Sequence, residues 1–166
     1  MKKLFLLLVT LFLFKGPVFA NLPIKYQAEL DMGYSLGVGA ASSDRVNFHT
    51  IHGIKIGDIL STGVGFGVDV HYKMSENGES VIPVYANIKR LFPVNDIVSP
   101  FYSMDVGVGI GASENIRGLS GVYLAPAVGV TIYTMKLQLG YNLQRISESG
   151  IGVNLHAIQF KIGLVF

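Results

Sequence analysis

The segment LSTGVGFGVDVHYK, residues 60–73, alternates strictly between two kinds of position. The even positions are mostly apolar and end in an aromatic residue: Leu60, Thr62, Val64, Phe66, Val68, Val70 and Tyr72. The odd positions are mostly glycine at first and then polar or charged: Ser61, Gly63, Gly65, Gly67, Asp69, His71 and Lys73. A strict period of two predicts a β-strand whose two faces lie in different environments.

The glycine-rich face indicates which environment each face meets. Glycine is a weak strand former, and it would be an unusual choice for the water-facing side of a soluble sheet. It suits the crowded interior of a narrow barrel, where side chains from many strands compete for space. We therefore expect the Val and Phe face to look outward at lipid, as in a transmembrane β-barrel. The opposite assignment, a soluble lipocalin-like binder, would bury the Leu and Val face and expose glycine.

The composition agrees with a surface that faces hydrocarbon. Charged residues make up 14% of the 166-residue chain, below the roughly 25% that is typical of soluble proteins. The chain has no cysteine, which excludes disulfides and thiolate metal sites. Three of the 13 basic residues, Lys2, Lys3 and Lys15, lie near the N-terminus, and the remaining 10 face 11 acids. This balance gives no reason to expect a nucleic acid as partner.

The first 20 residues are expected to be an export signal that is removed. Lys2 and Lys3 precede an apolar run over residues 4–14, which is too short to cross a bilayer as a helix. The run is followed by a break and then by residues that suit a signal peptidase up to Ala20. We expect cleavage after Ala20 and a mature domain of residues 21–166.

The mature chain continues in alternating segments without a useful helical period. Besides 60–73, strands are expected near residues 26–40, 45–57, 81–91, 101–112, 122–132, 136–143 and 154–166. About eight strands of this length are typical of the smallest common membrane barrels. Because an open sheet edge in hydrocarbon would leave backbone groups unpaired, we predict an all-β, closed, antiparallel, up-and-down transmembrane β-barrel. Apart from the connection at residues 92–100, tight turns alternate with longer polar loops, which places the loops outside and both termini in the periplasm.

Two positions interrupt this regular pattern. Pro126 in the sixth strand predicts a bulge or a lost ladder bond, because proline has no N–H to donate. In the second strand, the alternation aims His52 at lipid near mid-membrane, where an ionisable group is costly. We expect a bulge near Gly53 to turn His52 inward.

An exported chain of alternating strands that ends in an aromatic residue resembles the small outer-membrane β-barrel proteins of the OmpA, OmpX and opacity-protein type. In that family, a terminal Phe preceded by alternating apolar residues is the signal for the outer-membrane assembly machinery. The matching residues in this chain are Phe160, Ile162, Leu164 and Phe166. The resemblance implies the outer membrane of a Gram-negative-type bacterium, with lipid and the assembly machinery as partners. It implies no activity and no oligomeric state.

Charged side chains are expected to pair inside the barrel. Charges of both signs share the lumen-facing alternation: Glu29, Asp31, Lys55, Asp69, Lys73, Lys89, Asp105, Lys136 and Lys161. The interior of an eight-stranded barrel is only wide enough for side chains to fill. We therefore expect a polar, largely plugged lumen and no open pore.

Two small groups of residues are candidates for a site. His49, Asp69 and His71 would meet near the barrel mouth, where they could form an acid–base or metal site. Polar residues are ordinary at such a mouth, and we assign neither a metal nor a cofactor. Ser147 and His156 share the lipid-facing alternation near the last hairpin, where they could serve as nucleophile and base.

The leading hypothesis is an integral outer-membrane protein without enzymatic activity, with an envelope-structural or surface-contact role. A lipid-modifying hydrolase or acyltransferase is the first alternative, and it would rely on the Ser147 and His156 pair. A narrow channel or carrier of small molecules is the second, and it would require a continuous cavity along the lumen.

Overall fold

The computed structural model describes residues 23–39, 43–72, 78–113, 116–117, 119–148 and 151–166, with side chains left out at 146–148 and 151–153. The predicted export signal with its cleavage after Ala20 lies outside the described residues, as does Lys73. Within the described part of the chain, no helix is long and apolar enough to cross a membrane.

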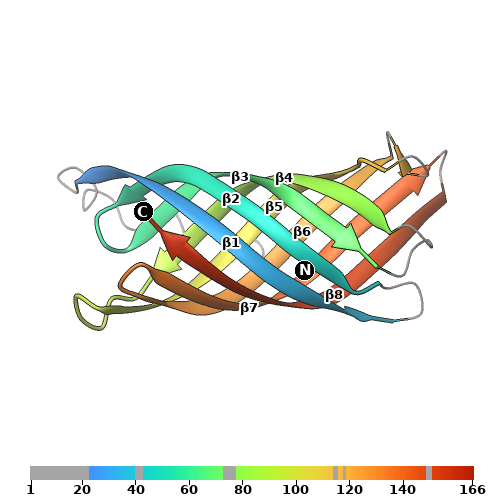
Figure 1. The fold of residues 1–166 in the computed structure, drawn as a ribbon. Coiled ribbons are helices and arrows are strands. Elements are labelled where there is room, and N and C mark those ends of the chain that lie inside the picture. Colours follow the sequence, from blue (N-terminus) through green and yellow to red (C-terminus); the bar gives the residue numbers. More distant parts are fainter. Residues whose placement is uncertain (1–22, 40–42, 73–77, 114–115, 118, 149–150) are drawn as a thin grey trace, which may run out of the picture.

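Eight antiparallel strands close into one barrel in sequence order (Figure 1). They are β1 (Ile24–Val38), β2 (Arg45–Ile56), β3 (Leu60–His71), β4 (Glu79–Leu91), β5 (Val98–Gly111), β6 (Ser120–Ile132), β7 (Met135–Glu148) and β8 (Ile151–Val165). Closure comes from β8, which pairs with β1 from Val38 opposite His156 to Glu29 opposite Val165. The predicted fold class is confirmed, with strand ends shifted by a few residues.

The connections between strands gather at two opposite ends of the barrel (Figure 1). We call the end with the connections 39–44, 72–78, 112–119 and 149–150 the loop end. The turn end carries the connections 57–59, 92–97 and 133–134 and the last residue of the chain. Connections 39–44, 72–78 and 112–119 are long and 57–59 and 133–134 are short, which is the asymmetry of outer-membrane barrels, whose loops face outside. The short connection 149–150 and the long connection 92–97 depart from it.

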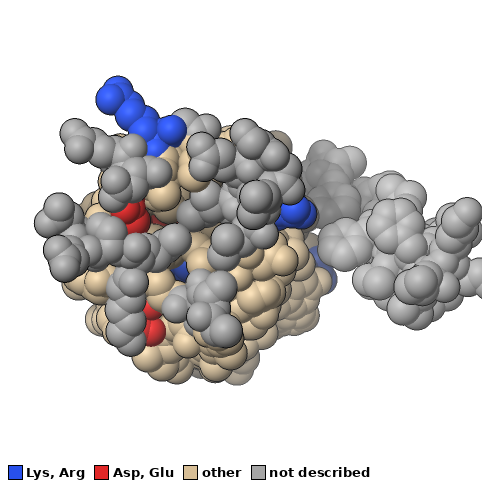
Figure 2. All heavy atoms as spheres, turned by 90° about the vertical axis from the view of Figure 1, so that its right-hand side faces the viewer, with Lys and Arg blue, Asp and Glu red and all other residues tan. Residues whose placement is uncertain are grey.

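The outer wall of the barrel is apolar and the inner face is polar, as the segment 60–73 predicts. Val64, Phe66 and Val68 point outward with 40–57% of their surface exposed, whereas Asp69 and His71 are fully buried inside. The wall that is visible from the loop end carries almost no charge (Figure 2). The Leu and Val face therefore lies outside, and the soluble lipocalin-like alternative is wrong.

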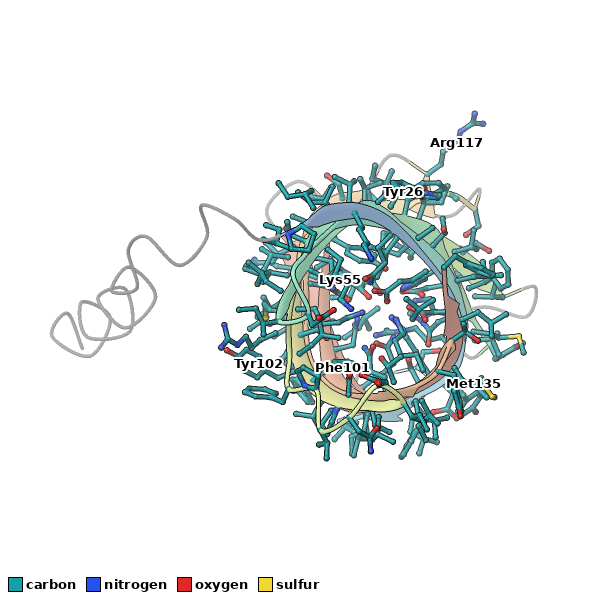
Figure 3. The ribbon with its side chains drawn as sticks, turned by 90° about the vertical axis from the view of Figure 1, so that its left-hand side faces the viewer. Tyr26, Lys55, Phe101, Tyr102, Arg117 and Met135 are labelled. Carbon is teal, nitrogen blue, oxygen red and sulfur yellow. The ribbon has the colours of Figure 1, made fainter. Side chains whose placement is uncertain are left out.

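The same division holds at the turn end, where Figure 3 looks into the barrel. Lys55 and Phe101 point into the lumen, while Tyr26, Tyr102 and Met135 point away from it. Aromatic rings that project outward at a barrel end suit the interface between the acyl chains and the lipid headgroups.

Inward-facing glycines make room for large side chains from neighbouring strands. A Cβ atom at position 65 would collide with the ring of Tyr85, and one at position 67 would collide with the ring of His49. The glycine face of β3 is therefore what allows the rings of β2 and β4 to occupy the lumen.

The expected bulge near Gly53 is wrong, and His52 does not turn inward. The β1–β2 and β2–β3 registers run unbroken through Gly53, which lies directly opposite Gly63 on β3. His52 stays on the lipid face, with its Nδ1 atom 2.6 Å from the Tyr26 hydroxyl and its Nε2 atom 3.1 Å from the Thr50 hydroxyl. These two partners satisfy the imidazole where it stands, so the strand has no need to bend.

Pro126 interrupts a ladder without changing its register. The β6–β7 ladder pairs Leu124 with Leu143 and next Ala127 with Gly140, and it omits the two residues in between. This pattern confirms the lost ladder bond and excludes the bulge, because proline lacks the N–H that the ladder would use.

Candidate functional site in the barrel lumen

The half of the lumen nearest the turn end holds a buried ion cluster. The Glu29 carboxylate pairs with the Nζ atoms of both Lys89 and Lys136, and Lys136 also lies 2.7 Å from Asp31 Oδ2. All four side chains are at most 2% exposed. Two carboxylates therefore balance two ammonium groups, as buried charges require.

Neutral groups complete this cluster. Gln27 donates a hydrogen bond from Nε2 to Glu29 Oε1 at 2.6 Å, and Lys89 Nζ lies 4.9 Å from the centre of the Phe101 ring. A cation over an aromatic face is attracted by the ring quadrupole. Lys55 lies nearer the rim, where it pairs at 3.0 Å with the exposed Asp58. The predicted pairing of lumen charges is confirmed for Glu29, Asp31, Lys55, Lys89 and Lys136. The buried Asp105 forms no ion pair among the described residues and accepts a hydrogen bond from Asn87 Nδ2 at 2.5 Å instead.

His49 and Asp69 meet at mid-lumen, as their positions on adjacent strands predict. His49 Nε2 lies 2.8 Å from Asp69 Oδ1, while Nδ1 lies 3.0 Å from Lys161 Nζ and 3.2 Å from the Tyr85 hydroxyl. An ammonium group can only donate, so Nδ1 accepts and the Nε2–H donates to Asp69. Both ring nitrogens are therefore occupied.

The third member of that candidate site stays apart. His71 lies opposite Arg45 on β2 and Glu79 on β4, nearer the loop end than the His49–Asp69 pair. Within the described part of the chain, no group of three or more His, Asp or Glu side chains is placed to hold a metal ion. The geometry brings two of the three residues together and gives them a structural hydrogen bond.

An aromatic layer lies next to this hydrogen-bonded pair. The rings of Tyr85 and Tyr123 stack with their centres 5.3 Å apart, and they pack with Ile51 and Ala125. Tyr85 lies midway along β4, four residues from Lys89 and four from Val81. The layer therefore lies between the ion cluster and the half of the lumen nearest the loop end.

The half of the lumen nearest the loop end is polar but incompletely paired. Arg45 donates from Nη2 to Asn142 Oδ1, and its Nε lies 4.0 Å from Asp69 Oδ2. Of twelve buried side-chain atoms without a hydrogen-bond partner among the described residues, ten lie here. They are Arg45 Nε and Nη1, Asp69 Oδ2, both ring nitrogens of His71, Tyr123 Oη, Asn142 Nδ2, both amide atoms of Gln144, and Gln159 Oε1.

These unpaired atoms are energetically significant. Each buried polar group without a partner costs about 1–3 kcal/mol, whereas the whole folding free energy of a protein is about 5–15 kcal/mol. His71 lies close to Gln144, and Tyr123 close to Gln159, without meeting hydrogen-bond geometry. Even if both of these pairs tightened, Arg45, Asp69 and Asn142 would still require further polar partners.

Aliphatic side chains close this half of the lumen toward the loop end. Val81 and Leu155 face inward from β4 and β8, and Ile116 packs against them from the connection between β5 and β6. A Cβ atom at position 111 would collide with the Ile116 carbonyl, which explains the glycine there.

Ser147 and His156 are offset along the last hairpin. Ser147 pairs with Gly152, whereas His156 pairs with Leu143, four residues away along β7. That offset is about 13 Å at a rise of roughly 3.3 Å per residue, well beyond a hydrogen bond. The Tyr141 hydroxyl lies 2.6 Å from His156 Nδ1. The side chain of Ser147 lies outside the described residues, so its role stays a prediction.

The four residues of the proposed assembly signal share the outer face of β8. Their exposed fractions run from 41% to 69%: Phe160, Ile162, Leu164 and Phe166. The apolar, lipid-facing character expected of them is confirmed, and their recognition by an assembly machinery stays a prediction.

Sequence reasoning missed several residues of the incompletely paired half. Arg45 has the same odd alternation on β2 as His49, and this pattern could have placed it in the lumen. Asn142 and Gln144 likewise share the inward alternation of β7. Their grouping around Arg45 depends on the closure of the barrel, which alternation within one strand does not report.

Comparison with protein-family models and with curated protein sequences returns no match. Solved structures match in fold. The crystal structure of Neisserial surface protein A aligns with a TM-score of 0.65 and 14% identity, over 86% of this chain and 97% of that one. The crystal structure of the outer membrane enzyme PagL aligns with a TM-score of 0.59 and 8% identity, over 82% of this chain and 98% of that one. The N-terminal β-barrel domain of Pseudomonas aeruginosa OprF aligns with a TM-score of 0.55 and 9% identity, over 87% of this chain and 100% of that one.

Proposed function

Because the chain has the fold of the small eight-stranded outer-membrane β-barrels, we propose that it is an integral outer-membrane protein without enzymatic activity. Its role would be envelope-structural or in surface contact. The observation that carries this proposal is the buried, charge-balanced cluster around Glu29, which lies within the turn-end half of the lumen. A lumen that this cluster blocks leaves the apolar wall and the loop end as the surfaces that act.

The ion cluster also bears on the channel alternative. A solute that crossed the barrel would have to displace Lys89 and Lys136 from Glu29, which leaves buried charges unpaired. We therefore expect the purified protein in planar lipid bilayers to show no conductance steps. Regular steps that depend on the inserted protein would favour a channel over the structural role.

The structural role predicts a phenotype in the cell. Removing the gene from its native host should sensitise cells to detergent, and expression of the intact chain should restore resistance. A Ser147→Ala, His156→Ala double variant should restore resistance equally well, because the proposed role uses the folded wall and not these side chains. Failure of a normally folded double variant to restore resistance would overturn the proposal in favour of chemistry at this corner.

A lipid-modifying enzyme is the second candidate, since the outer membrane enzyme PagL shares the fold. The test is to incubate the purified barrel with outer-membrane lipids and to look for released fatty acid by mass spectrometry. We expect no release above a heat-denatured control. Release that disappears in His156→Ala would establish the enzyme.

A further inference from the structure

The loop-end half of the lumen carries an inference that does not depend on the proposed function. We infer that it is a one-ended binding chamber for small, uncharged solutes that both donate and accept hydrogen bonds, water above all. The chamber is lined by the residues with unpaired polar atoms, namely Arg45, Asp69, His71, Tyr123, Asn142, Gln144 and Gln159, together with Ala157.

The unpaired atoms set the chemistry of the ligand. Arg45 Nε and Nη1 and Asn142 Nδ2 can only donate, whereas Asp69 Oδ2 and Gln159 Oε1 can only accept. A ligand that satisfies them must therefore present acceptors and donors together, as water, hydroxyl groups and amides do.

The charge of the chamber points to the same class of ligand. Its unpaired charged atoms belong to one guanidinium and one carboxylate, with Arg45 Nε 4.0 Å from Asp69 Oδ2. A second buried carboxylate, Glu79, lies opposite His71 and accepts a hydrogen bond from the Ser113 hydroxyl. A simple anion would face the free oxygen of Asp69, and a simple cation would face the free N–H groups of Arg45. An uncharged ligand meets neither repulsion.

The two sides of the chamber are covered by different kinds of side chain. Toward the turn end, the stacked rings of Tyr85 and Tyr123 pack with Ile51 and Ala125, and the balanced ion cluster lies beyond them. Only two of the twelve unpaired atoms belong to that other half, Asp31 Oδ1 and Asn87 Oδ1. Toward the loop end, the described residues that cover it include the aliphatic side chains of Val81, Ile116 and Leu155. Solutes therefore reach the chamber from the loop end and stop at the aromatic layer.

Because the chain has no cysteine, single cysteines can report on solute access. Ala157 lies in the chamber opposite Asn142, and Ala125 lies in the aromatic layer. Their exposed fractions are 0% and 1%, so exposure alone predicts equal reactivity. Ala157→Cys and Ala125→Cys are treated separately with methyl methanethiosulfonate, a small uncharged reagent that leaves a methyl disulfide, and the reaction is followed by mass.

We expect the cysteine at position 157 to react at least tenfold faster than the cysteine at position 125 in folded barrels. Both variants are first checked for the mobility shift on boiling that marks a closed barrel. Equal rates, or faster reaction at position 125, would overturn the inference. So would protection of both cysteines for as long as the barrel stays folded.

A second measurement needs no variant and covers the case in which a cysteine disturbs the fold. In detergent micelles, magnetisation transfer from water should reach the side-chain amide of Asn142 but not that of Asn87, whose Nδ2 donates to Asp105 Oδ1 at 2.5 Å. Transfer to neither amide, or equal transfer to both, would contradict a hydrated chamber on one side of the aromatic layer.

Discussion

The ion pairs of Glu29 allow the effect of its substitution on the free energy of unfolding to be predicted. Glu29→Gln keeps the shape of the side chain but removes the charge that Lys89 and Lys136 share. Lys136 retains Asp31 at 2.7 Å, whereas Lys89 loses the only carboxylate that forms an ion pair with it among the described residues. One ammonium group, 2% exposed, is thereby left without a counter-charge.

Breaking a buried pair by removing one partner costs about 3–5 kcal/mol. We therefore expect Glu29→Gln to lower the free energy of unfolding by about that amount. The loss of stability comes from Lys89, whose buried charge is left unpaired. Glu29→Gln combined with Lys89→Met should therefore recover most of the lost free energy of unfolding. The matched control is Lys55→Gln, which breaks a pair with an 81% exposed Asp58 and should cost no more than about 1 kcal/mol.

Unfolding in urea with the barrel in lipid vesicles provides the assay. Far-ultraviolet circular dichroism is a suitable signal, because the chain has no tryptophan for fluorescence. With a slope of about 1–3 kcal/mol per molar urea, the predicted loss moves the midpoint by more than about 1 M. A Glu29→Gln midpoint that matches wild type, or a double variant no more stable than Glu29→Gln alone, would refute the reasoning.

Three further predictions test the wall and the strand faces. Gly65→Leu should prevent stable folding or cost about 1–3 kcal/mol by collision with Tyr85, while Val64→Leu on the outer face should change the urea midpoint little. His52→Arg should cost up to about 2–4 kcal/mol on the lipid face, whereas His52→Leu should stay within about 1 kcal/mol in the same assay; equal effects would place the side chain elsewhere. Phe166→Ser should reduce the amount of protein in the outer-membrane fraction by several fold, measured by immunoblot, and unchanged levels would remove Phe166 from the assembly signal.

The sequence predicts the wall and the lumen well because alternation is a local property. The alternation within each strand determines which of its side chains point into the lumen. Closure of the barrel determines only which residues of other strands these side chains meet. The segment 60–73 alone therefore places Asp69 and Phe66 on the correct faces. His52 follows the same rule. Its position in the alternation places it on the lipid face, where the structure has it, and the bulge expected to turn it inward is absent from the β1–β2 and β2–β3 registers.

The pairing inside the lumen could not be predicted in the same way. Glu29 and Lys136 are 107 residues apart in the chain, and they meet only because β8 closes onto β1 with one particular register. The hydroxyl of Tyr26 on β1 reaches His52 on the adjacent strand β2, two residues away from the directly opposite position. This contact depends on the register of the two strands as well as on alternation. Such contacts follow from the geometry of the closed barrel and leave no pattern within a single strand.

The central claim is a closed barrel whose apolar wall faces lipid, and electrophoresis of membrane-extracted protein in mild detergent tests it most directly. The unboiled sample should keep its barrel and migrate differently from the boiled sample, and the protein should be recovered from the outer-membrane fraction. Protein that is soluble without detergent and migrates identically before and after boiling would contradict the account.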